Sequence, residues 1–184
     1  DLDGLVKGVL FLLADTGVFI IEAYYLADLI RKNLFDTIYH EHLSYFTVQT
    51  LVALFTRLGM EVFLVEKTDT HGGSLRVYVQ KKGGPQRVDA SIDKFIAEEI
   101  AAGLNLASTF IAFEKAISDN KAELLKLLND LKARGKKIVG YGAPAKGNTL
   151  LNYFGIGAET LDYIVDDSPW KQKLYTPGTH IPVV

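Results

Sequence analysis

The first 86 residues alternate between helical and strand-like hydrophobic patterns. The opening stretch, with Asp1 or Asp3 available as N-cap, predicts an amphipathic helix. Its apolar positions are Leu2, Leu5, Val6, Val9, Leu10 and Leu13. The unbroken apolar run over residues 18–21 predicts a strand that is buried on both faces of a mainly parallel sheet. Glu22, Tyr24 and Tyr25 follow it, at the place where open α/β sheets bind their ligands.

A second helix and a hairpin complete this region. Residues 48–58 have one apolar helical face, and Thr47 and Gly59 provide its start and end signals. Residues 60–68 predict a strand. After a glycine turn, apolar residues alternate with Arg76, Tyr78 and Gln80, which predicts a half-exposed strand. This order is typical of the second half of a doubly wound sheet finished by an antiparallel hairpin, so the expected fold class is α/β.

The rest of the chain predicts a helical connector and a second α/β region. The Lys-Lys-Gly-Gly-Pro stretch at residues 81–85 is a linker signal. Residues 88–134 have a helical pattern that breaks near Gly103 and has a possible joint at residues 118–120. A strand over residues 137–142, a helix from Lys146 and a strand over 160–166 then predict a β-α-β unit. The expected parts are residues 1–86, 87–134 and 135–184.

Composition limits the classes of function. The 184 residues are enough for one good core or two small ones, and 48% hydrophobic with 23% charged residues is ordinary for a soluble protein. The net charge of -2 argues against nucleic acid as a partner. The chain has no cysteine, which excludes disulfides and thiolate metal sites within it. With no apolar run that could cross a bilayer, we expect no membrane partner and a cytoplasmic location.

Residues 39–42, Tyr-His-Glu-His, are the densest group of proton-carrying side chains. In an extended segment His40 and His42 point to one side, and Tyr39 and Glu41 to the other. Two histidines could ligate zinc, but no third ligand is evident, so no metal site is expected. A histidine base in a proton network with a carboxylate and a phenol is one interpretation. A surface loop with hydrogen-bonded histidines is the alternative.

Two glycine-containing loops are further candidates. In the first, Gly72 and Gly73 permit positive φ and close approach to a ligand, and the neighbouring His71, Ser74 and Arg76 supply donors. The alternative is a hairpin turn that needs its glycines for steric reasons.

The second loop, residues 140–145, has the Gly-x-Gly-x-x-Ala form of a dinucleotide fingerprint, with Asp166 about twenty positions later. Lys146 would add charge, whereas Pro144 removes one amide that a phosphate would need. A phosphate-binding loop for some nucleotide is therefore favoured over NAD specifically.

Three motifs together resemble the sugar C-methyltransferase family. They occupy residues 36–46, 70–76 and 140–149, and they occur in the family's order and spacing. The family's enzymes depend on S-adenosylmethionine and add a carbon-bound methyl group to keto-deoxysugars carried on a nucleoside diphosphate. The resemblance implies enzymes with three domains: a cysteine-ligated zinc domain, a methyltransferase domain and a Rossmann-like domain. In such enzymes the sugar nucleotide lies between the last two.

The resemblance implies an identity for each part of the chain. Residues 1–86 would be the C-terminal half of a class I methyltransferase Rossmann-like sheet. Residues 87–134 would be the connector, and 135–184 the start of a second Rossmann-like lobe that binds the nucleotide sugar. The chain lacks the zinc domain and the glycine-rich loop that holds S-adenosylmethionine. We therefore expect a fragment that is inactive alone, with zinc only in a missing N-terminal domain.

The resemblance also implies roles for individual residues. His42 is the expected base, with Tyr39 and Glu41 steering the proton and polarising the sugar oxygens. The residues expected to bind the sugar, the diphosphate or the nucleotide are His71, Gly72, Gly73, Ser74, Arg76, Gly142, Lys146 and Asn148. Two alternatives stay open: an NAD-dependent oxidoreductase, which rests on Gly140 and Asp166, and a non-catalytic module that binds nucleotide sugars.

Overall fold

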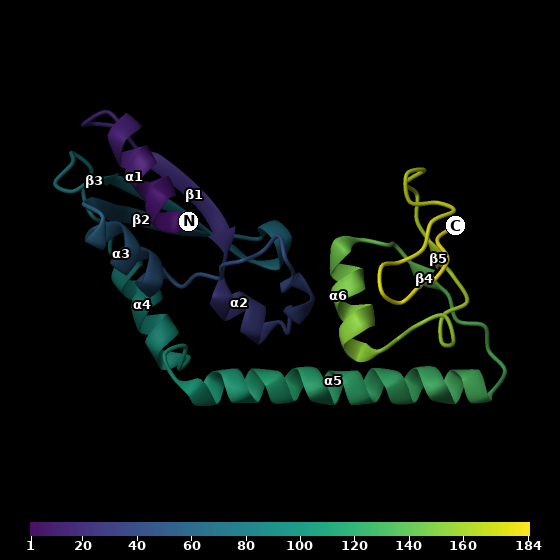
Figure 1. The fold of residues 1–184 in the computed structure, drawn as a ribbon. Helices are drawn as coiled ribbons and strands as arrows, with labels where there is room; N and C mark the ends of the chain where they lie inside the picture. The colour runs from purple at the N-terminus through teal and green to yellow at the C-terminus, as the bar shows by residue number, and fades with distance from the viewer. The chain divides into compact units, whose positions relative to one another are not determined.

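The computed structural model describes residues 1–70 and 72–184, so the predicted binding residue His71 lies outside the described residues (Figure 1). The chain divides into two compact units. The N-terminal unit consists of Asp1–Leu34 and Ser44–Ile111, and the C-terminal unit of Phe35–Leu43 and Ala112–Val184. Segment 35–43 therefore packs with the C-terminal unit, although the residues on both sides of it belong to the N-terminal unit.

The N-terminal unit is built on a three-stranded antiparallel sheet. Its strands are β1 (Phe19–Tyr24), β2 (Met60–Thr68) and β3 (Ser74–Lys81), in the order β1-β3-β2. Because β3 is antiparallel to both neighbours, β1 and β2 run in the same direction and their carboxyl ends lie at one edge. With the surrounding helices this gives a mixed α/β architecture, which confirms the predicted fold class.

The prediction of a strand buried on both faces of a parallel sheet is wrong for residues 18–21. β1 is antiparallel to β3, and its burial alternates. Phe19 and Ile21 pack on the core, whereas Ile20 is 53% exposed. Only one face of β1 is covered by the described residues, so the apolar run does not mean two-sided burial.

Four helices accompany this sheet: α1 (Leu2–Leu12), α2 (Leu26–Arg31), α3 (Val48–Arg57) and α4 (Ser91–Ala101). Asp1 caps α1 and Thr47 caps α3, as predicted. The core gathers fully buried valines of β3 around Leu51 and Phe55 of α3. The alternation predicted Gln80 on the solvent face, and this is wrong. Gln80 is 0% exposed, and its amide donates to Glu61 and to the Gln86 carbonyl.

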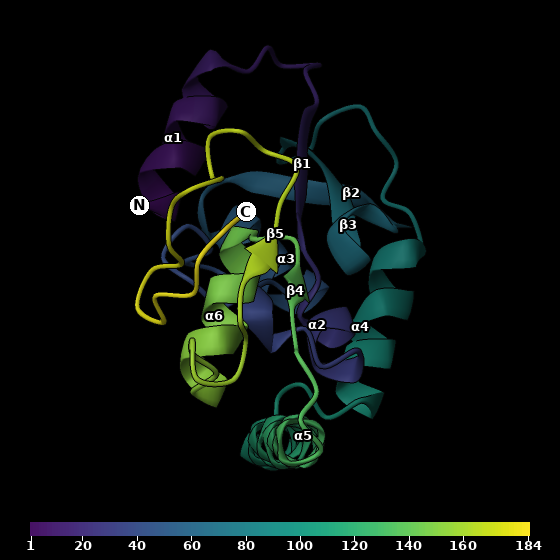
Figure 2. The same ribbon diagram turned by 90° about the vertical axis from the view of Figure 1, so that its right-hand side faces the viewer.

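The C-terminal unit has a two-stranded parallel sheet, β4 (Gly140–Tyr141) and β5 (Ile164–Val165), beside helix α6 (Ala145–Phe154) (Figure 2). This is the predicted β-α-β order with shorter strands. Its core includes Phe154, Ile156, Leu161 and Ile181. A 3-10 turn, η1 (Phe35–Thr37), contacts α6.

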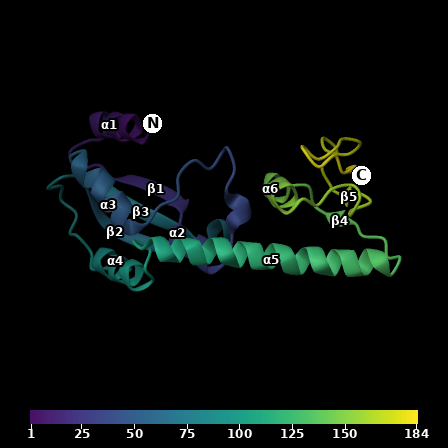
Figure 3. The ribbon, with the colours of Figure 1, turned by 60° about the horizontal axis from the view of Figure 1, so that its bottom comes forward.

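Helix α5 (Ala107–Ala133) is continuous, so the predicted joint at residues 118–120 is wrong (Figure 3). The predicted break near Gly103 is confirmed, because α4 ends at Ala101 and α5 starts at Ala107. None of the helices in the described residues is both long and apolar enough to span a membrane.

Candidate active-site segments

Residues 39–42 form a tight turn and not the extended segment that the sequence suggested. The His42 backbone N–H donates to the Tyr39 carbonyl at 2.9 Å. The turn brings the Tyr39 and His42 rings together, with 4.4 Å between ring centroids. The prediction that Tyr39 and His42 point to opposite sides is therefore wrong, because a turn does not alternate its side chains as a strand does.

The hydrogen bonds of His42 define which nitrogen can act as a base. Nδ1 lies 2.8 Å from the Thr37 carbonyl oxygen. A carbonyl can only accept, so Nδ1 must carry the hydrogen, and in the neutral ring Nε2 is the acceptor nitrogen. Nε2 lies 3.5 Å from the Tyr39 hydroxyl, at the outer limit of a hydrogen bond. The turn thus presents a basic nitrogen beside a phenol.

His40 and Glu41 lie at the exposed tip of this turn. Both are in the C-terminal unit with His42, as segment 35–43 is. Among the described residues, no group of three or more His, Cys, Asp or Glu side chains is placed to hold a metal ion. The expected role of Glu41 stays a prediction.

The glycine turn of the N-terminal unit is tied to helix α2. Gly72 and Gly73 have φ values of 88° and 140°, which favour glycine. The Gly72 carbonyl accepts from the Lys32 ammonium group, and the Gly73 carbonyl from the Tyr25 N–H at 3.2 Å. A Cβ on Gly73 would overlap the Asp28 carboxylate. The positive φ values and the lack of room for a Cβ at Gly73 explain sterically why glycines occupy this turn.

Ser74 and Arg76 are both engaged within the N-terminal unit. The buried Ser74 hydroxyl donates to the Thr70 carbonyl at 3.0 Å. Arg76 donates to Glu22 through Nε at 3.2 Å and Nη2 at 2.9 Å, across the register of β3 and β1. A ligand would have to compete with Glu22 for this guanidinium group.

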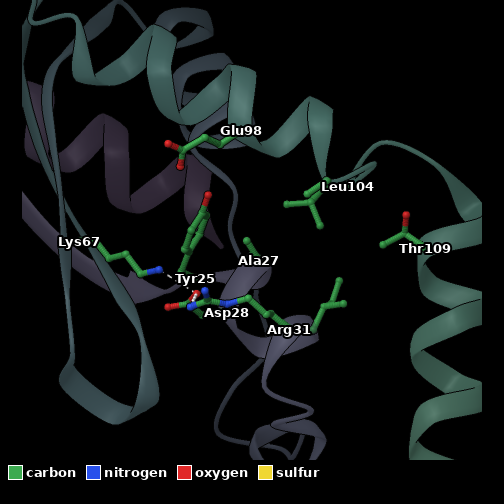
Figure 4. Close-up of a pocket in the computed structure, with 10 residues that line it drawn as sticks. Tyr25, Ala27, Asp28, Arg31, Lys67, Glu98, Leu104 and Thr109 are labelled. Atoms are coloured by element: carbon green, nitrogen blue, oxygen red, sulfur yellow. Dashed lines mark hydrogen bonds and ion pairs between the residues drawn. The ribbon is translucent and has the colours of Figure 1, made fainter.

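A pocket lies at the carboxyl ends of β1 and β2, where the sequence predicted a ligand position beside Tyr25, but its charged residues were not predicted. Its volume is about 340 Å³, and its lining includes Asp28, Arg31 and Lys67, which converge in Figure 4. Asp28 is only 2% exposed, and each cation lies 2.8 Å from its Oδ1. Burial opposes ionisation of Asp28, but the hydrogen bond from Lys67 and the nearby cations hold its pKa below the ordinary value. Neither helix α2 nor a role for Asp28 was predicted from the sequence.

Tyr25 and Glu98 also line this pocket. Burial, and after it the Glu99 carboxylate, raises the pKa of the Tyr25 phenol well above its ordinary value of 10.0, so the phenol stays protonated. The lining carries two cations and two carboxylates, whose charges balance. The pocket therefore has no surplus charge with which to attract a diphosphate.

In the C-terminal unit, the loop between β4 and α6 is held by Asp166. This buried carboxylate accepts from the Ala143 N–H at 2.7 Å and the Ser168 N–H at 2.9 Å, and Lys171 lies 3.1 Å away. These backbone hydrogen bonds, with Lys171, lower the pKa of Asp166 to about 2. A carboxylate so engaged stabilises the loop, whereas the dinucleotide interpretation needs it on a ribose hydroxyl.

The predicted nucleotide-side residues gather around the start of α6. Gly142 has a φ of 84°, and Lys146 and Asn148 lie in the first turn of the helix. Asn148 lines a pocket of about 340 Å³ together with Lys171 and Tyr175. The structure thus places Tyr39, Glu41, His42, Gly142, Lys146 and Asn148 in the C-terminal unit, and Gly72, Gly73, Ser74 and Arg76 in the N-terminal unit.

Two comparisons with known proteins match this chain, one over residues 69–184 and one over its full length. The family described as the C-methyltransferase C-terminal domain matches residues 69–184. C-methyltransferase NovU from Streptomyces niveus is 36% identical over 183 residues, which cover 100% of this chain and 44% of that protein. The chain therefore spans less than half the length of this relative.

Proposed function

Since the chain belongs to the C-methyltransferase C-terminal domain family, we propose that it carries the base and part of the substrate site of an S-adenosylmethionine-dependent C-methyltransferase. The proposed substrate is a keto-deoxysugar on a nucleoside diphosphate. Because the chain covers 44% of its relative, the proposed activity belongs to a protein that joins this chain to a cofactor-binding part. That protein is called the complete enzyme below, and the chain alone is expected to be inactive.

The observation that carries this proposal is the hydrogen bond from His42 Nδ1 to the Thr37 carbonyl. It commits the neutral ring to one tautomer and leaves Nε2 as the proton acceptor. A ketone acidifies the C–H bond on the neighbouring sugar carbon. In the proposed step Nε2 takes that proton, and the bonding electron pair moves towards the carbonyl oxygen to give an enolate.

Tyr39 and Glu41 have supporting roles in this proposal. The Tyr39 hydroxyl lies beside Nε2 and would donate to a developing oxyanion or to the ring nitrogen. Glu41, exposed on the same turn, would polarise the sugar oxygens or steer the proton. Both roles come from the resemblance and await a test.

Among the described residues, the first strand–helix connection of the N-terminal unit does not have the loop expected to hold S-adenosylmethionine. In the N-terminal unit, β1 leads through Tyr25 directly into α2, with no glycine-rich loop between strand and helix. When bound elsewhere in the complete enzyme, the cofactor would supply an electrophilic methyl group. No residue of this chain is assigned to it.

For the substrate, we propose that the α6 start binds the nucleotide side through Gly142, Lys146 and Asn148. The turn at Gly72 and Gly73, with His71, Ser74 and Arg76, would line the sugar or the diphosphate. The Arg76–Glu22 ion pair implies that Arg76 acts only after it exchanges this partner.

Replacement of the base tests the proposal in the complete enzyme. His42→Ala should lower kcat by about 100- to 10,000-fold, which is the usual worth of a general base, and leave S-adenosylmethionine binding unchanged in calorimetry. His40→Ala, at the exposed neighbouring position, is the matched control and should keep most activity. Undiminished turnover by His42→Ala would reject His42 as the base. Binding of NADH without binding of S-adenosylmethionine would favour an oxidoreductase, and binding of sugar nucleotide without turnover would favour a non-catalytic module.

A further inference from the structure

The segment that carries His42 is held by the C-terminal unit. Phe35–Leu43 clusters with Ala112–Val184, whereas the residues on both sides of it cluster with the N-terminal unit. A segment that packs with a different unit from its neighbours in the sequence needs stabilising contacts there to anchor it, because ordering nine residues costs conformational entropy.

Phe35 is the anchor. Its side chain is 7% exposed, and its ring stacks on Phe154 of α6 with 5.2 Å between centroids and 19° between planes. Tyr153 adds a tilted contact at 5.9 Å. A hollow of about 240 Å³, lined by Phe35, Ile38, Ile117, Thr149 and Tyr153, lies beside the ring. The segment therefore has room to shift if the ring is removed.

A short series of hydrogen bonds connects this anchor to the imidazole. The Ile38 N–H donates to the Phe35 carbonyl at 2.9 Å, which closes the η1 turn. Thr37, in the same turn, is 1% exposed, and its carbonyl accepts from His42 Nδ1 at 2.8 Å. The atom that selects the tautomer of His42 is thus two residues from the anchoring ring.

We propose that Phe35 is the positioning residue of His42. Its stack on Phe154 holds the Thr37 carbonyl in place, and this carbonyl keeps the hydrogen on Nδ1 and the acceptor lone pair on Nε2. The C-terminal unit thereby controls proton abstraction through a segment whose neighbours in the sequence, on both sides, belong to the N-terminal unit. The catalytic part of this inference rests on the proposed role of His42, whereas the control of its tautomer does not.

The first test is nitrogen NMR of the His42 ring in this 184-residue chain. The wild type should show the Nδ1–H tautomer, and Phe35→Ala should show a mixture of both tautomers. Phe35→Leu, which keeps an apolar side chain at the position, should restore most of the wild-type signal. Leu161→Ala is the matched control, since Leu161 is 8% exposed in the same core. It should leave the signal unchanged, although it also destabilises the unit.

The second test is turnover in the complete enzyme. Phe35→Ala should lower kcat about 100-fold with little change in KM, the effect of a small misplacement of a catalytic group. Leu161→Ala should retain kcat. An unchanged His42 tautomer in Phe35→Ala overturns the positioning role, and so does a tautomer change in Leu161→Ala of the same size. The two proposals fail separately, because the NMR signal needs no turnover, whereas His42→Ala tests the base alone.

Discussion

At the scale of single residues, Gly73 is the position where the backbone and a buried charge leave no room for a side chain. Its φ is 140°, and a Cβ would overlap the Asp28 carboxylate. Asp28 is itself surrounded by the cations of Arg31, Lys32 and Lys67. A shift of this carboxylate would weaken its ion pairs while it stays buried, which is costly.

Gly73→Ala should therefore lower the free energy of unfolding by about 3 kcal/mol through combined clash and backbone strain. Gly83→Ala is the matched control. Gly83 also has a positive φ, 75°, but nothing lies within 4 Å of its added Cβ, so only the strain of about 1 kcal/mol remains. Denaturant unfolding of the two variants measures the difference. Equal losses would show that the Asp28 contact is unimportant.

The sequence indicated which residues carry proton chemistry, but not which of their atoms meet. Tyr39 and His42 were expected on opposite sides, and a single turn places their rings 4.4 Å apart. Asp28 was missed because its partner Lys67 is 39 residues away. The hydrogen bond that fixes the His42 tautomer goes to a backbone carbonyl, and every residue has one, so side-chain patterns cannot reveal it.

At the scale of elements, the N-terminus of helix α3 is capped by a carboxylate from helix α4, which is distant in the sequence. Glu99 of α4 is 2% exposed and accepts from the Val48 and Gln49 N–H groups at 2.6 and 3.1 Å. A carboxylate at a helix start satisfies amides that have no partner within the helix and interacts favourably with the helix dipole. Thr47 supplies only the local part of this cap.

Glu99→Ala should cost about 2–3 kcal/mol of unfolding free energy, because it leaves the buried Val48 amide and the partly buried Gln49 amide without their acceptor. Glu98→Ala removes the same charge from an exposed neighbour in α4 and should change stability by less than about 0.5 kcal/mol. Thermal unfolding monitored by circular dichroism compares them. A Glu99→Ala variant as stable as Glu98→Ala would show that Thr47 caps α3 sufficiently.

The loop that precedes α6 should depend on pH through Asp166. Its pKa is lowered to about 2 by the Ala143 and Ser168 amides and by Lys171, from an ordinary value of 3.8. A carboxylate with a lowered pKa stabilises the folded state fully above its ordinary pKa, and this contribution is lost as the pH falls towards the lowered value. Asp166→Asn should therefore be less stable than the wild type at pH 7, and the difference should shrink between about pH 4 and pH 2. A difference that stays constant over this range would exclude ionised Asp166 as its cause.

Hydrophobic patterns predicted helices and strands better than they predicted breaks within the helices. Ser118, Asp119 and Asn120 suggested a joint, but α5 continues through them because its exposed face accepts polar residues. An ion pair of 2.6 Å between Lys115 and Asp119, one turn apart, supports the helix there. The break at Gly103 was predictable, since a glycine with a φ of 68° ends a helix for a local reason.

At the scale of the whole molecule, the position of a segment in the sequence does not decide to which unit it belongs. Linker and helix signals predicted boundaries after residues 86 and 134, and these stay predictions. No local signal assigned Phe35–Leu43 to the C-terminal unit, because its contacts there, such as the stack of Phe35 on Phe154 more than one hundred positions later, are with residues distant in the sequence. The periodicity of hydrophobic residues along the sequence does not reveal tertiary packing of this kind.

This membership predicts how the backbone of segment 35–43 exchanges its hydrogens. The Ile38 and His42 amides are hydrogen-bonded within the segment and should open together with the C-terminal unit. Ile156→Ala, which truncates a core residue of that unit, should speed their exchange at least about 30-fold, since such truncations cost about 2–5 kcal/mol. Leu51→Ala, in the core of the N-terminal unit, should speed exchange in α3 but not at these two amides. Hydrogen exchange measured by NMR in both variants tests this, and faster exchange of Ile38 and His42 in Leu51→Ala would place segment 35–43 with the N-terminal unit.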